Sequence, residues 1–118
     1  MQPKQPTPTV TRVDVERVVR RDFPPDQFDS VMSILAEYGS ETWHRELHRV
    51  QLAVLKLADG KVDGLRPEIE TAKRDYRDVL ANAEYPAYTF RVSQLPAEEQ
   101  RKIIDSDWSQ YETWLKKR

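Results

Sequence analysis

Two apolar stripes separated by six residues constrain the fold of this chain most strongly. In the first stripe, apolar side chains alternate at steps of four and three: Trp43, Leu47, Val50, Val54 and Leu57. The second stripe continues that spacing: Leu65, Ile69, Ala72, Tyr76, Val79 and Ala83. Such spacing places side chains on one helical face. Because only residues 59–64 connect the stripes, we predict an antiparallel helical hairpin, whose first helix has Ser40 as its N-cap.

Three helices are predicted outside this hairpin. Thr11 and Asp14 have the spacing of a capping box at the start of a helix that ends before Pro24, although its many valines leave a strand as an alternative. A second helix begins at Pro25 or Asp26 and ends near Gly39. The last helix begins at Pro96.

Residues 85–95 interrupt the helical pattern. Tyr88, Phe90 and Val92 alternate along the chain, which predicts a short extended piece that crosses the bundle. The complete pattern predicts an all-α fold: an up-and-down helical bundle of four main helices around the hairpin, plus a short N-terminal helix. We expect residues 1–10, which are rich in proline, to form a flexible arm and residues 11–118 to form a single domain.

Composition excludes several classes of protein. The 118 residues include 19 Lys and Arg, 20 Asp and Glu and no cysteine, so a disulfide framework, a thiolate metal site and a cysteine nucleophile are excluded. No apolar run approaches the roughly 18 residues of a membrane span, and no secretory leader is visible. We therefore expect a cytoplasmic protein without a membrane partner. No catalytic residue and no cofactor is expected, because no nucleophile–base order and no phosphate-binding glycine loop stands out.

One group of residues has the spacing of a metal site. Glu41, His44 and His48 would project from the same face of the predicted helix, and imidazole and carboxylate groups are ligands for zinc, iron or manganese. The alternative function is therefore a metal-dependent helical-bundle enzyme, with further ligands from acids such as Asp75 or Glu84. The competing interpretation places both histidines at the boundary of the core.

Basic residues on the same predicted helix suggest a weaker alternative. Arg45, Arg49 and Lys56 would form a basic stripe that could contact a phosphate backbone, as in a nucleic-acid accessory protein. Acidic residues are interleaved throughout the chain, however, and no recognition helix or stacking platform can be identified. Solvated helix faces are the favoured interpretation, and we do not expect a nucleic-acid partner.

The leading hypothesis is a non-catalytic domain that binds a partner protein or associates with itself. It rests on arginine and aromatic side chains left outside the predicted core, since these types are enriched in protein interfaces. The candidate partner-binding residues are Arg45, Arg49, Tyr85, Tyr88 and Trp114. An equally weighted interpretation is that the aromatic side chains pack against the bundle.

Four stretches resemble a group of small, all-helical bacterial proteins without an assigned activity. Residues 50–60, 72–80 and 83–86 carry the resemblance, and residues 107–115 are similar to the ends of those proteins. The shared features are packing patterns rather than chemical signatures. The resemblance implies a bacterial, cytoplasmic protein, and no catalytic residue is carried over from it.

Overall fold

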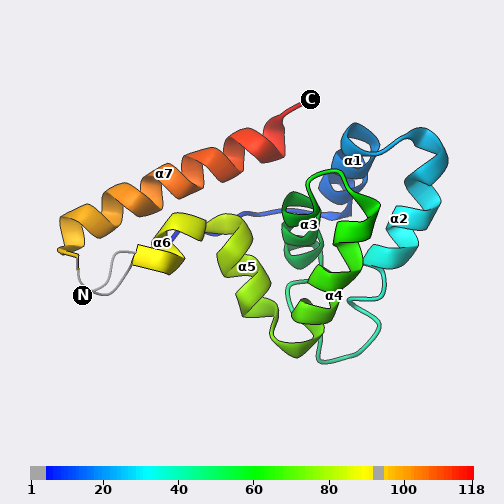
Figure 1. Cartoon of the computed structure of the whole chain (residues 1–118), viewed down its shortest axis with the longest axis horizontal. Helices are drawn as coiled ribbons and strands as arrows, with labels where there is room; N and C mark the ends of the chain where they lie inside the picture. Colours follow the sequence, from blue (N-terminus) through cyan, green and yellow to red (C-terminus); the bar gives the residue numbers. More distant parts are fainter. Residues whose placement is uncertain (1–4, 92–94) are drawn as a thin grey trace.

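The structure is a computed structural model that describes residues 5–91 and 95–118. This part of the chain contains α-helices and no strand, which confirms the predicted all-α fold (Figure 1). The helices are α1 (Arg12–Asp22), α2 (Phe28–Leu35), α3 (Leu47–Ala58), α4 (Leu65–Arg74), α5 (Tyr76–Glu84), α6 (Pro86–Arg91) and α7 (Ala97–Lys116). Short 3₁₀ turns, η1 (Pro25–Gln27) and η2 (Val62–Gly64), lead into α2 and α4.

Local sequence signals set the starts of α1 and α7 as predicted, whereas the helix expected from Pro25 or Asp26 to near Gly39 is shorter, with α2 spanning only Phe28–Leu35. The N–H of Thr11 donates to Asp14 Oδ2 at 2.9 Å, and Thr11 Oγ1 accepts from Val13 N at 3.2 Å. The predicted capping box therefore starts α1, and the alternative of a strand is wrong. Pro25 begins the η1 turn before α2. Pro96 directly precedes α7, whose acidic first turn suits the positive end of the helix dipole.

Two predicted helices have different boundaries. The helix expected from Ser40 begins only at Leu47, so Ser40 is not an N-cap. The helix expected over residues 65–83 is divided at Asp75, whose backbone is extended, with φ −158° and ψ 100°. Its Oδ1 accepts from Arg77 N at 3.1 Å. Asp75 therefore caps a new helix, because a short carboxylate side chain competes for the backbone groups that would continue the old one.

The extended piece predicted before residue 95 is also wrong. Residues 86–91 form helix α6, and Val92 lies outside the described residues. The buried carboxylate of Asp107 on α7 accepts from the N–H of Tyr88 at 2.9 Å and of Ala87 at 3.4 Å. A carboxylate from a distant helix thus satisfies the first turn of α6, which a local pattern does not reveal.

The core consists of two clusters of apolar side chains. The larger one joins α1 to α5 around α3, which contacts α1, α4 and α5. The smaller one lies at α6 and α7 and contains Tyr85, Tyr88 and Ile104, with Ile103 and Trp108 partly buried against it. Seven helices therefore build the described part of the domain, where four main helices and a short one were expected. None of them is long and apolar enough to cross a membrane.

Helix α7 extends along one side of the molecule, and its end reaches α1 (Figure 1). Arg17 Nη2 donates to the carbonyl of Leu115 at 2.6 Å, and Arg21 Nη1 donates to those of Trp114 and Lys117 at 2.6 and 2.8 Å. Two guanidinium groups of α1 thus cap the carbonyl end of α7. This contact links the first and last helices and holds the end of α7 beside the larger core cluster.

Candidate functional site

The loop between α2 and α3 is folded by the side chain of Tyr38. Its buried hydroxyl donates to the carbonyl of Arg45 and accepts from Arg45 N at 3.0 Å. Burial raises the pKa of this hydroxyl, so Tyr38 is a neutral donor at ordinary pH. Gly39 follows with φ 109°, and a Cβ atom there would overlap Leu47 Cδ1. The chain therefore leaves the helical path at Gly39, and Tyr38 bonds to backbone groups that a longer α3 would use.

His44, near the end of the loop, contacts both Tyr38 and the backbone at the start of the loop. Its ring stacks on Tyr38, with centroids 4.5 Å apart and an interplanar angle of 13°. His44 Nδ1 accepts from Gly39 N at 2.7 Å and from Glu41 N at 3.4 Å, which places the proton of the neutral ring on Nε2. The rings of Trp43 and His44 meet edge to face, with their centroids 5.7 Å apart, yet Trp43 is 64% exposed. The prediction that Trp43 lies in the core is wrong, because residues 40–46 are not helical.

The loop and the junction between α4 and α5 enclose a cleft of about 420 Å³, which we name the loop cleft. One side consists of Trp43, His44 and Arg45 with Tyr38, and the other of residues 72–77. The lining holds four cationic side chains, Arg45, Lys73, Arg74 and Arg77, and one carboxylate, Asp75. At neutral pH the formal charge of the lining is therefore about +3, in a chain whose net charge is −1.

Two of these cations already have a carboxylate partner. Arg77 Nε and Nη2 donate to Asp75 at 3.0 and 3.2 Å, and these bonds lower the pKa of Asp75. Lys73 lies 3.7 Å from Glu70. Arg45 and Arg74, both exposed, form no ion pair with any residue of the described chain. The loop cleft thus presents two guanidinium groups whose charge is not neutralised locally.

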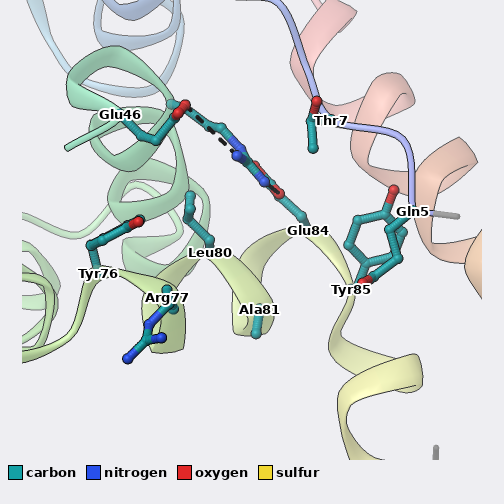
Figure 2. Close-up of a pocket in the computed structure, with 10 residues that line it drawn as sticks. Gln5, Thr7, Glu46, Tyr76, Arg77, Leu80, Ala81, Glu84 and Tyr85 are labelled. Atoms are coloured by element: carbon teal, nitrogen blue, oxygen red, sulfur yellow. Dashed lines mark hydrogen bonds and ion pairs between the residues drawn. The ribbon is translucent and has the colours of Figure 1, made fainter.

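A second pocket of about 420 Å³ lies between α5, the start of α3 and the arm (Figure 2). Arg49 Nε and Nη2 donate to the two oxygens of Glu84 at 2.8 and 2.7 Å. Glu84 is 1% exposed and Arg49 19% exposed, and this pairing raises the pKa of Arg49. Glu46 lies 3.7 Å from the same guanidinium. Because both of its cations are paired, Arg49 with Glu84 and Glu46 and Arg77 with Asp75, we interpret this pocket as part of the framework rather than as a binding site.

The arm crosses the same region as an extended segment. Pro6, Pro8 and Val10 are half-buried and alternate with exposed residues, and the hydroxyl of Tyr85 donates to the carbonyl of Pro6. Gln5 and Thr7 line the second pocket opposite Glu84 (Figure 2). Residues 5–10 therefore lie against the domain, while residues 1–4 of the predicted flexible arm lie outside the described residues.

The predicted metal-ligand set is not brought together. Glu41 and His44 lie in the loop and only His48 lies on α3, so the prediction of one shared helical face is wrong. Among residues 5–91 and 95–118, no three His, Asp or Glu side chains are grouped so that they could hold a metal ion. The proposed additional ligands are engaged elsewhere, Asp75 with Arg77 and Glu84 with Arg49.

The predicted basic stripe is dispersed in the same way. Arg45 lies in the loop and is exposed, whereas Arg49 is paired with Glu84. Lys56 is half-buried, and burial lowers its pKa. These three residues therefore do not form one exposed surface.

Of the candidate partner-binding residues, only Arg45 is exposed. Tyr85 and Tyr88 are buried in the smaller core cluster. Trp114 is partly buried, and the guanidinium of Arg21 lies 5.1 Å from its ring centre. The accessible aromatic side chains are instead Trp43 and Phe90, the latter 80% exposed. The signals that could have identified Trp43 were Gly39, which follows α2, and the neighbouring Tyr38 and His44.

No protein-family model, curated protein or solved structure matches the chain.

Proposed function

We propose that the chain is a non-catalytic protein-binding domain and that the loop cleft is its contact surface. The observation that carries this proposal is the exposed ring of Trp43, held by contact with the ring of His44, which itself stacks on Tyr38. Tryptophan and arginine are the residue types that contribute most to protein interfaces. Because the indole already has defined neighbours in the isolated chain, association orders it at a small entropic cost.

The chemistry of the cleft supports binding over catalysis. His44 is the one histidine in its lining, and the Nδ1 atom of that ring accepts hydrogen bonds from backbone N–H groups. The lining contains no serine, threonine or cysteine that His44 could activate. A cleft with aromatic rings, arginines and an irregular loop is suited to holding a side chain or short segment of another protein.

Site-specific photo-crosslinking in the source cells tests this proposal. A photoreactive amino acid replaces Lys73, at the edge of the cleft, and the captured polypeptide is identified by mass spectrometry. We expect Trp43→Ala to reduce the crosslink yield about tenfold or more, since loss of an interface anchor costs about 2 kcal/mol. The matched control is Phe90→Ala, which removes the other exposed aromatic ring of the described chain, one that lies outside the cleft.

Three outcomes are distinguished by this experiment. A captured polypeptide that depends on Trp43 and not on Phe90 supports the proposal. If that polypeptide is a second copy of this chain, the binding is self-association, and sedimentation of the purified protein will show a dimer that Trp43→Ala dissociates. Absence of any captured polypeptide, or a yield unchanged by Trp43→Ala, refutes the proposed function.

A further inference from the structure

We infer that the segment received by the loop cleft is acidic: a short peptide stretch with carboxylate side chains next to an apolar one. The inference rests on the proposed function and specifies the chemistry of the partner. Its basis is the pair of exposed guanidinium groups, Arg45 and Arg74, on the two sides of the same cleft.

The geometry of arginine favours a carboxylate ligand. A guanidinium group is a planar fork that donates two parallel hydrogen bonds to a carboxylate. The described chain uses this arrangement three times, with Arg21 on Asp22, Arg49 on Glu84 and Arg77 on Asp75. Arg45 and Arg74 present the same group without a carboxylate of the described chain. A partner that brings two or three carboxylates would neutralise the cleft.

The surroundings of the cleft limit the length of the anion that fits. Glu70 lies beside Lys73, Asp75 lies within the lining, and Glu46 lies beside Arg49 in the neighbouring pocket. The positive charge is therefore confined to one cleft instead of continuing as a stripe. A nucleic acid presents a continuous row of phosphates, which would approach these carboxylates at its next contacts. A short acidic segment avoids them.

Trp43 favours a ligand that also carries an apolar side chain. Its ring flanks the basic lining, and a purely charged ligand would leave the exposed indole in water. An apolar side chain adjacent to the acidic residues would cover the ring and remove apolar surface from water. We therefore expect an alternation of carboxylate and apolar side chains in the bound segment.

Peptide binding to the full chain tests this inference. The probes are a fluorescent blocked peptide in which glutamates flank a leucine, the same peptide with glutamines, and single-stranded oligothymidylate. Anisotropy is measured at low and physiological ionic strength. We expect the glutamate peptide to bind at least tenfold tighter than the glutamine peptide and its affinity to fall as salt is raised.

Charge-reversal variants locate the binding site. The double variant Arg45→Glu, Arg74→Glu should weaken glutamate-peptide binding at least tenfold. The control, Arg101→Glu, Lys102→Glu, makes the same charge change at exposed positions on α7 and should leave binding within twofold. Circular dichroism confirms that each variant is folded; all four replaced side chains are exposed.

Failure of this inference can be told apart from failure of the proposed function. If the crosslinked partner depends on Trp43 but the Arg45→Glu, Arg74→Glu variant captures it equally well, the cleft binds protein and the acidic specificity is wrong. Equal affinity for the two peptides, or no binding of the glutamate peptide up to millimolar concentration, also overturns the inference. Tighter binding of oligothymidylate than of the glutamate peptide overturns it in favour of a nucleic-acid partner.

Discussion

We expect Arg49→Met to lower the free energy of unfolding by about 3–4 kcal/mol, because it leaves a carboxylate buried without its partner. Glu84 is 1% exposed and receives hydrogen bonds of 2.8 and 2.7 Å from Arg49. Each bond to a charged group contributes about 1.5–3 kcal/mol. The sum of the two bond contributions is an upper bound on the loss of stability. Arg49 is 19% exposed, so in the variant water can reach Glu84 and solvate part of its charge. Half-exposed Glu46 adds little to the pair.

Urea unfolding followed by far-ultraviolet circular dichroism measures this loss. With a slope of about 1.5 kcal/mol per molar urea, the midpoint should fall by about 2 M. Arg45→Met is the matched control, since it removes an arginine without an ion pair in the described chain and should change stability by less than about 0.5 kcal/mol. The double variant Arg49→Met, Glu84→Leu removes both charges and should regain most of the loss.

A double-mutant cycle decides whether the two groups act as a pair. The reasoning requires a coupling energy of about 2 kcal/mol or more between Arg49 and Glu84. It is refuted if the effects of Arg49→Met and Glu84→Leu are additive, or if Arg49→Met costs less than about 1 kcal/mol. Either result would mean that Glu84 is solvated in spite of its position beneath the arm and α3.

Three other predictions concern the backbone and the buried tyrosines. Gly39→Ala should cost about 1–2 kcal/mol in thermal unfolding, because φ is 109° and the overlapping Leu47 Cδ1 ends an exposed side chain that can move aside. Gly60→Ala, at a φ of 76° and with only an ordinary contact to the added Cβ, should cost about 1 kcal/mol. Tyr111→Phe removes a buried hydroxyl without a hydrogen-bond partner in the structure, so urea unfolding should show a change below about 1 kcal/mol; a larger loss would reveal an unseen bond. Burial raises the pKa of Tyr85 and Tyr111 above the value of about 10 that a tyrosine has in an unfolded chain. The neutral hydroxyls therefore contribute their full stability below about pH 10, and this contribution is lost as the pH rises from about 10 toward the folded-state pKa. Urea midpoints that do not fall above about pH 10 would contradict this prediction.

The parts of the fold that were predictable are those that depend on neighbouring residues. The capping box of Thr11 and Asp14 starts α1, and Pro96 directly precedes α7. In each case the sequence signal and the backbone group that it satisfies are within four residues of one another. The start of α6 could not be found in this way, because Asp107 reaches it from another helix.

Asp75 shows how a local signal can be read in two ways. In the sequence it belongs to a run of opposite charges that fits i, i+4 pairing on a continuous helix. In the structure the same carboxylate bonds to the backbone and side chain of Arg77, and the helix divides there. On a continuous helix the positions three and four residues from Asp75 hold Thr71, Ala72, Asp78 and Val79, so no cation there would pair with it. The divided helix pairs Asp75 with Arg77, and α4 and α5 each pack against α3. Tertiary packing thus overrides a helix propensity of a few tenths of a kcal/mol per residue.

The site was missed for a related reason. Trp43 and Leu47 are four residues apart, which is the spacing of a buried helical face, and this periodicity places the indole in the core. The structure puts Tyr38 in the core instead, where its hydroxyl bonds to both backbone groups of Arg45. Of the candidate partner-binding residues, Arg45 lines the cleft because the loop carries it there, not because of its place on a helix.

The hydrogen bonds of Tyr38 and His44 that keep residues 40–46 from forming a helix also shape the loop cleft. A helix through residues 40–46 would satisfy its own backbone and could bury Trp43 beside Leu47. The folded loop leaves Trp43 in water, which is unfavourable for so large a side chain, and it relies on Tyr38 and His44 for its backbone hydrogen bonds. An arrangement that gives up apolar burial yet is fixed by specific bonds is expected where binding later recovers that burial. The conformation of the loop cleft therefore favours the proposed binding of a partner protein.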